Sequence, residues 1–359
     1  MKDKIITYTF IITISLFFII NLITKDKDIS KEERRHLNKM PEISLNSIYS
    51  ETFKDKFNSY TMDQFCYREK FKQLKGLSSK ILLMKENNNI LKLNNNLFQT
   101  DYSTNINSLN HLTDLINNIN NEYLKNNKNK YFILIPDKNY YIKDKSIPRK
   151  DYNLINKTLE NNLDNNIKFI ELSNELNLDS YYKTDIHWKQ DKLDNVVNKL
   201  SNYLDLKTEL ITTTDSYYPF YGSLFSNTTS NIKGDKIIIR TNEVIENAKV
   251  YNYETKKTEK VYEKNNLKNI DSYDIFLGGA TPLLEITNTK EKQNKELIIF
   301  RDSFASSLTP LLINSYSKIT LIDLRYFGSS NLKNININKK ADVLFMYSIP
   351  IINNSYSLK

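Results

Sequence analysis

The sequence of 359 residues has little cysteine, glycine, proline or histidine. The single cysteine, Cys66, excludes an intramolecular disulfide and any metal site built from several cysteines. Only three histidines, His36, His111 and His187, are available as a catalytic imidazole. With 6 Gly against 24 Tyr and 17 Phe, the composition favours an ordered, aromatic-rich fold.

The chain also has no concentrated block of charge. The formal net charge of +9 comes from 51 Lys and Arg against 42 Asp and Glu, without an uninterrupted basic run or a zinc or Arg-rich motif that reads nucleic acid. We therefore expect no nucleic-acid partner. The positive excess is either a solvated surface in a Lys- and Asn-rich composition or an attraction to an anionic envelope polymer or membrane face.

Residues 5–24 form an uncharged, apolar stretch. About 20 helical residues at about 1.5 Å each match a bilayer core, so residues 1–24 are predicted to be a transmembrane anchor. No small residues spaced as in a cleavage site follow the stretch, because Leu22-Ile23-Thr24 passes straight into Lys25, and we expect the anchor to be retained. The similar charges on both flanks do not fix its orientation.

Residues 25–60 are polar and charged and are predicted to form a juxtamembrane linker, with order beginning near Phe53. The length of the remaining part, residues 61–359, suits one principal domain. Apolar residues step by three and four along 106–123 and 193–204, which predicts two amphipathic helices.

Short apolar runs predict buried strands. They lie at residues 131–135, 167–172, 297–300, 319–322 and 343–346, with a helix at 303–315. Alternating strands and helices favour an α/β fold with a parallel sheet and helices on both faces. Residues 208–285 differ, since short runs at 237–239 and 273–277 stand between polar segments, and they are predicted to be an inserted, partly antiparallel β region.

Ser303 stands where the strand at 297–300 is predicted to end and a helix to begin. Nucleophiles and ligands of open α/β sheets lie at the carboxyl ends of strands, where free backbone N–H groups can also bind an oxyanion. The alternative interpretation is a helix cap, because Asp and Ser are favoured there for satisfying backbone donors.

His187 is the remaining candidate for a base, since His36 lies in the linker and His111 lies beside the apolar face of a predicted helix. In an extended segment, Asp185 and His187 point to the same side, so the carboxylate can orient the imidazole that activates a serine. A structural hydrogen-bonded pair or half of a metal site are the alternatives. No second His or Cys is near in sequence, and we expect no metal.

Two motifs carry a family resemblance: Thr184-Asp185-Ile186-His187-Trp188 and, far downstream, Arg301-Asp302-Ser303-Phe304. Together they resemble the DHHW family and the related alginate O-acetylation proteins, which have an SGNH-hydrolase-like domain. Weaker similarities lie at residues 38–41, 63–68, 135–138, 221–223 and 323–325. The Asp/His motif precedes the Ser motif, the reverse of ordinary SGNH hydrolases. Arg301 replaces the family's usual Gly, and Ile186 a His.

The resemblance implies that Ser303, with His187 and Asp185, accepts an acyl group, usually acetyl, and passes it to a carbohydrate hydroxyl without a cofactor. It implies an extracytoplasmic, membrane-anchored O-acyltransferase acting on an envelope or exported polysaccharide, with a polytopic membrane acyltransferase as donor. A carbohydrate acetylesterase with the same triad and a non-catalytic acetylation scaffold stay open.

Further site residues are expected beside this triad. The candidate oxyanion donors are the backbone N–H of Ser303 and the turn at Gly222 and Ser223. The substrate-binding candidates are Arg325, Arg301 and Trp188. For Arg325, a surface salt bridge is the alternative to binding a substrate carboxylate.

Overall fold

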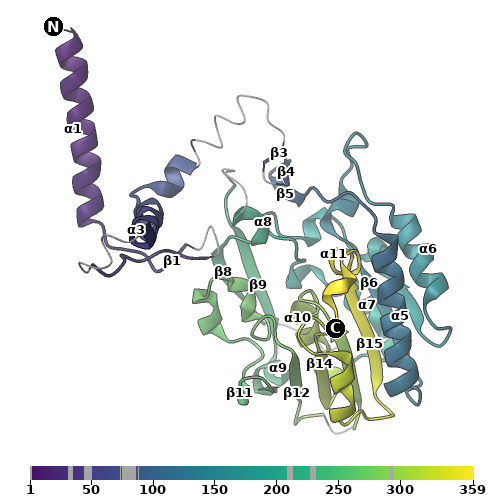
Figure 1. The fold of residues 1–359 in the computed structure, drawn as a ribbon. Helices are drawn as coiled ribbons and strands as arrows, with labels where there is room; N and C mark the ends of the chain where they lie inside the picture. The colour runs from purple at the N-terminus through teal and green to yellow at the C-terminus, as the bar shows by residue number, and fades with distance from the viewer. Residues whose placement is uncertain are drawn as a thin grey trace.

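The computed structural model describes residues 2–30, 35–43, 51–72, 74, 86–87, 89–207, 213–226, 232–291 and 294–359. At its centre lies a sheet of eight strands in the order β11-β10-β12-β14-β13-β15-β6-β7 (Figure 1). The strands are β6 (Lys130–Ile135), β7 (Lys168–Glu171), β10 (Lys249–Asn252), β11 (Lys257–Glu259), β12 (Leu283–Thr287), β13 (Glu296–Arg301), β14 (Lys318–Ile322) and β15 (Asp342–Ser348). Each predicted buried strand is therefore present.

The central sheet is mixed rather than wholly parallel. Strands β14, β13, β15, β6 and β7 are parallel to one another, as predicted. At one edge, β12 pairs antiparallel with β14, and β10 pairs antiparallel with both β12 and β11. The antiparallel pairing of these three strands agrees with the partly antiparallel β region predicted for residues 208–285. They belong to, or begin in, the segment 208–285, which extends the main sheet by antiparallel pairing.

The same segment contains a second, separate pair of strands. β8 (Thr213–Phe220) and β9 (Asp235–Thr241) pair antiparallel, and β9 contains the predicted run at 237–239. The strand predicted at 273–277 is wrong, because the 3₁₀ helix η6 (Ser272–Ile275) occupies most of it, capped by the Asp271 side chain. A short apolar run does not distinguish a strand from a buried helical turn.

Helices cover both faces of the sheet, as predicted (Figure 1). One face carries α5 (Ile106–Tyr123), α6 (Tyr152–Asn162), α11 (Ile349–Ile352), η8 (Ser329–Asn334) and η9 (Ser355–Ser357). The other carries α7 (Asp194–Leu204), α9 (Glu243–Asn247), α10 (Ala305–Leu308) and η7 (Thr309–Ser315). Successive residues of a strand point to opposite faces, so Ile298 and Ile299 of β13 enter different cores, which explains why the strands are apolar throughout.

The N-terminal part begins with α1 (Lys2–Ile23), the one described helix that is long and apolar enough to cross a membrane, with a hydropathy of 2.2. A signal sequence has the same properties. Asn21 near its end accepts a hydrogen bond of 2.7 Å from the backbone N–H of Cys66, and Phe17 stacks on Phe65. The last turns of α1 thus contact the residues that follow α3.

The predicted linker contains ordered elements. β1 (Ile29–Ser30) pairs with β2 (Arg35–His36), and α3 (Glu51–Gln64) begins close to the expected onset of order at Phe53. Asp63 of α3 binds the Arg35 guanidinium and the backbone N–H of Asn38. The other described elements are β3 (Glu86–Asn87), β4 (Ile90–Leu93), β5 (Asn96–Gln99), α8 (Ser223–Ser226), η1 (Lys138–Tyr141), η2 (Ser173–Glu175), η3 (Leu178–Ser180), η4 (Gln190–Lys192) and η5 (Lys264–Lys268).

Candidate active site

Ser303 lies in the turn that follows β13, at the carboxyl edge of the parallel part of the sheet, and is partly exposed. The helix predicted at 303–315 is divided into α10, which begins at Ala305, and the 3₁₀ helix η7. Asp302 fixes the turn, because its carboxylate accepts hydrogen bonds from the backbone N–H of Phe304 and from the N–H and hydroxyl of Ser348. The loop bearing Ser303 is thus tied to the end of the neighbouring strand β15.

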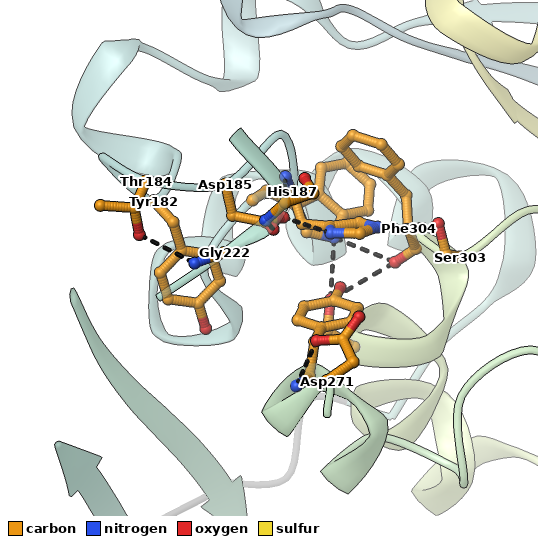
Figure 2. Close-up of polar contacts among 12 residues, drawn as sticks. Tyr182, Thr184, Asp185, His187, Gly222, Asp271, Ser303 and Phe304 are labelled. Carbon is orange, nitrogen blue, oxygen red and sulfur yellow. Dashed lines mark hydrogen bonds and ion pairs between the residues drawn. The ribbon is translucent and has the colours of Figure 1, made fainter. Parts of the chain in front are cut away.

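The imidazole of His187 reaches Ser303 although 116 residues separate them in sequence. Its Nε2 lies 2.7 Å from the Ser303 Oγ, and its Nδ1 lies 2.5 Å from Asp185 Oδ1. Figure 2 shows how the three side chains point toward one another. The three side chains form one continuous hydrogen-bonded chain. This is the arrangement in which a carboxylate orients an imidazole and the imidazole accepts the proton of a serine hydroxyl.

Asp185 and His187 are brought together by a bend rather than by the extended segment that we expected. Tyr181 and Trp188 pair across a short antiparallel bridge, and the residues between them form the bend. The Asp185 Oδ1 also accepts the backbone N–H of His187 at 2.9 Å. Both side chains therefore face one side, as predicted, but for a different geometric reason.

The turn at Gly222 and Ser223 supports Asp185. The backbone N–H of Ser223 donates to Asp185 Oδ2 at 2.5 Å, and that of Gly222 donates to the Thr184 hydroxyl at 3.1 Å. Because both N–H groups have acceptors, we correct our assignment of this turn as an oxyanion donor. A Cβ on Gly222 would lie 2.2 Å from the Asp185 Cβ, so the contact requires glycine.

Two residues that sequence analysis did not single out complete the surroundings of the triad. Asp235 of β9 accepts hydrogen bonds from the backbone N–H groups of Lys183 and Thr184 and from the Thr184 hydroxyl. Tyr273 of η6 stacks on the His187 ring at 4.1 Å and 12°, and the Phe304 ring lies 4.8 Å from the same imidazole. Neither belongs to a local motif, and only the tertiary fold brings them here.

The backbone N–H of Ser303 remains a candidate donor to the oxyanion. Among the described residues it donates no hydrogen bond, whereas the next N–H, of Phe304, is used by Asp302. An N–H beside the attacking oxygen is well placed to stabilise the charge of a tetrahedral intermediate.

Trp188 and Arg301, both predicted to contact substrate, are completely buried. The Trp188 indole N–H donates to the Phe304 carbonyl and the Ser307 hydroxyl. The Arg301 guanidinium donates to the Ser306 hydroxyl at 2.6 Å and the Thr281 hydroxyl at 3.1 Å, and burial lowers its pKa. We correct both assignments: these side chains support the Ser303 turn from within the protein and have no surface to offer to a substrate.

Arg325, the third substrate-binding candidate, forms an ion pair with Asp323. Its Nε and Nη2 lie 2.9 and 2.6 Å from the Asp323 carboxylate oxygens, and 18% of its side chain is exposed. Although partial burial disfavours the charged guanidinium, the pair raises the pKa of Arg325. The Nε and Nη2 groups of the guanidinium thus bind a carboxylate of the protein itself. This agrees with the alternative that Arg325 forms a salt bridge and does not bind a substrate carboxylate.

Metal ligands do not gather at this edge or elsewhere in the described ranges, where no group of three or more His, Cys, Asp and Glu side chains is arranged to hold an ion.

No protein-family model and no curated protein sequence matches the chain. Solved structures do. Bacillus cereus PatB1 with a sulfonyl adduct aligns with a TM-score of 0.59 and 20% identity over 73% of this chain and 95% of that one. A second PatB1 structure gives the same TM-score and identity, with 96% of its chain covered. A DHHW family protein from Eubacterium siraeum has a TM-score of 0.59 and 15% identity over 76% of this chain and 94% of its own. The resemblance to the DHHW family is thus confirmed at the level of the fold: the chain has the fold of a DHHW family protein and of PatB1.

Proposed function

We propose that the chain is a serine O-acyltransferase that passes an acyl group, most simply acetyl, to a carbohydrate hydroxyl through an acyl-enzyme on Ser303. The observation that carries the proposal is the unbroken contact from Asp185 through His187 to the Ser303 hydroxyl, at 2.5 and 2.7 Å. A serine hydroxyl is a weak nucleophile until a neighbouring base accepts its proton. His187 is held in position for that task by Asp185 and by the two aromatic rings against it.

In the first half of the reaction, Ser303 Oγ attacks the carbonyl carbon of the acyl donor while its proton moves to His187 Nε2. The negative charge on the carbonyl oxygen faces the Ser303 N–H, and collapse of the intermediate expels the donor's leaving group with the proton from His187. Asp185 stays ionised and stabilises the imidazolium.

In the second half, the acceptor hydroxyl attacks the acyl carbon and gives its proton to His187 Nε2. The bond between the acyl carbon and Ser303 Oγ breaks, and Oγ receives the proton, which restores the resting enzyme. Water in place of the sugar hydroxyl would make the same site a carbohydrate acetylesterase. The two activities differ only in which hydroxyl group reaches the acyl-enzyme.

We further propose that α1 anchors the domain on the outer side of a membrane. Its 22 residues suit a bilayer span, and none of them is buried against the protein. An acyl donor made inside the cell would have to be delivered across the membrane, so the partner we propose is a polytopic membrane acyltransferase, and the acceptor an envelope or exported polysaccharide.

The decisive experiment is Ser303→Ala in the full chain, with Ser330→Ala, an exposed serine of η8, as the matched control. Ser303→Ala should abolish acyl transfer and release of p-nitrophenol from p-nitrophenyl acetate, because no nucleophile is left. Its unfolding free energy should fall by only about 1 kcal/mol, the loss of one hydrogen bond. Ser330→Ala should change neither the activity nor the unfolding free energy.

Mass spectrometry after brief exposure to the acetate should find acetyl on the peptide that contains Ser303. A sulfonyl reagent offers a second label, since PatB1 has been solved with a sulfonyl adduct. A folded protein that never acquires either label, and whose Ser303→Ala variant still supports polymer acetylation in cells, would identify the chain as a non-catalytic scaffold.

A further inference from the structure

A cavity of about 310 Å³ lies outside the carboxyl ends of the parallel strands, next to the triad. Phe304 follows β13, Pro350 follows β15, Asp137 follows β6, and Ile186 lies between Asp185 and His187; all four line the cavity. In the sheet, β14 lies on one side of β13 and β15 lies on the other. The chain passes from β13 to β14 and then crosses back to β15, so the direction in which strands are added reverses at this cavity. Ligands of open α/β sheets bind at such a reversal.

The residues that line the cavity are of two kinds. Phe304, Ile186, Leu224 and Pro350 are apolar lining residues, and Phe304 also contacts the His187 ring at 4.8 Å. The polar lining residues include Asp101, Asp137 and Lys150. A ring with apolar C–H faces and hydroxyl groups on its edges matches both kinds of lining residue.

The charges of the polar lining residues compensate one another. Lys150 lies 3.0 Å from Asp101 and 3.8 Å from Asp137, and the Asp137 carboxylate also accepts the Tyr152 hydroxyl at 2.7 Å. The other cation of the wall, Lys138, points its ammonium at the carbonyls of Leu97, Tyr182 and Lys183. The cavity therefore presents hydrogen-bonding groups without a net charge to attract an ion.

Two exposed amide side chains also line the cavity, Gln99 at the end of β5 and Asn354 after α11. Within the part of the chain that the structure describes, neither side-chain amide makes a hydrogen bond. Each can donate to and accept from a hydroxyl group. The volume is close to about 300 Å³, the lower limit for ligand pockets, which suits one ring and not a chain of several.

We propose that this cavity is the acceptor subsite and binds one uncharged pyranose residue, a hexose or an N-acetylhexosamine, with a hydroxyl directed at the acyl carbon on Ser303. The inference rests on the proposed acyl transfer and specifies its acceptor. The apolar lining residues pack against the ring, and the amides of Gln99 and Asn354 bind its hydroxyl groups.

The test compares Asn354→Trp, which fills part of the cavity, with the control Asn331→Trp, an equally exposed asparagine in η8. Acetyl transfer from p-nitrophenyl acetate to methyl β-glucoside and to its N-acetylglucosamine analogue is measured beside release of p-nitrophenol without sugar. Asn354→Trp should lower transfer at least about tenfold more than release. Asn331→Trp should leave both unchanged. Gln99→Ala should raise the KM for the sugar.

Binding is measured separately by saturation-transfer NMR on the Ser303→Ala protein, which cannot turn over. The two neutral glycosides should bind and methyl glucuronide should bind more weakly; preference for the glucuronide overturns the inference. Equal loss of transfer and release in Asn354→Trp also overturns it, since the cavity would then hold the acyl group. If Ser303→Ala still releases p-nitrophenol, the proposed function fails, whereas sugar binding remains a separate result.

Discussion

The carboxylate of Asp185 accepts hydrogen bonds from the backbone N–H of His187, the His187 ring and the backbone N–H of Ser223. It is completely buried. These contacts hold the buried side chain in one orientation. Orientation of the imidazole is therefore fixed by contacts from two separate loops.

Replacing Asp185 by Asn should reduce activity less than replacing His187 by Ala. An amide can still accept one hydrogen bond, but its NH₂ group opposes the donors, so loss of about ten-thousandfold in turnover is expected for Asp185→Asn. His187→Ala removes the base itself and should leave only background activity. Turnover of p-nitrophenyl acetate measures both. An equal loss in the two variants would indicate that the carboxylate takes part more directly in proton transfer.

Gly222→Ala should impair catalysis without changing any triad residue. The added methyl group would lie 2.2 Å from the Asp185 Cβ and 2.3 Å from its Oδ2, so the carboxylate must move. Small displacements of catalytic groups can cost about a hundredfold, and overpacking about 1–3 kcal/mol of stability. The control is Gly328→Ala, where the nearest atom is 3.7 Å away. Full activity of Gly222→Ala would show that Asp185 tolerates displacement.

At the level of elements, the site depends on how β13 and β15 end. Asp302, after β13, accepts two hydrogen bonds from Ser348, the last residue of β15. The loop with Asp185 is bound in the same way by Asp235 of β9. Buried carboxylates without their donors are costly, so these links keep the loops in one arrangement.

The helix α1 is predicted to remain attached in the mature protein. No small residues with cleavage spacing follow its apolar run, and Asn21 and Phe17 contact Cys66 and Phe65. Mass spectrometry of the N-terminus of the protein isolated from membranes is the measurement. A combined Leu22→Ala and Thr24→Ala variant, which introduces the spacing, is the positive control. A native terminus beginning after Thr24 would show that the segment is a signal peptide.

Several tyrosine side chains from different parts of the chain are buried in the folded molecule. Tyr181, Tyr182 and Tyr347 come from different segments, are almost fully buried, and have pKa values raised by that burial well above 10.0. In the unfolded chain each would ionise near its ordinary pKa. The folded state therefore keeps protons that the unfolded state loses, and stability falls as the pH rises above about 10.

Alkaline unfolding should consequently be steep. Each such tyrosine lowers the free energy of unfolding by up to about 1.4 kcal/mol per pH unit above its unfolded-state pKa. Absorbance of tyrosinate and circular dichroism, followed together from pH 9 to about 12.5, should show the buried groups ionising in one step with loss of structure. Gradual ionisation while the circular dichroism persists would contradict the expectation.

The sequence by itself determined the main sheet and its helical cover. Strands β6, β13, β14 and β15 are buried on both faces and are therefore apolar throughout. Helices α5 and α7 are buried on one face and therefore have apolar residues three and four apart. Both patterns can be recognised locally in the sequence. It also singled out Ser303, His187 and Asp185, because few histidines exist and each motif has a characteristic local context.

Only the tertiary structure decided what surrounds those three residues. Tyr273, Asp235 and the Gly222 turn reach the site from the segment 208–285, whose contacts are long-range and leave no periodic pattern. The burial of Arg301 and Trp188 could likewise not be predicted from the sequence, because it depends on hydrogen bonds that their polar groups form with residues of the folded structure. Local patterns report which face of an element is apolar, whereas the contents of a site depend on which distant loops meet there.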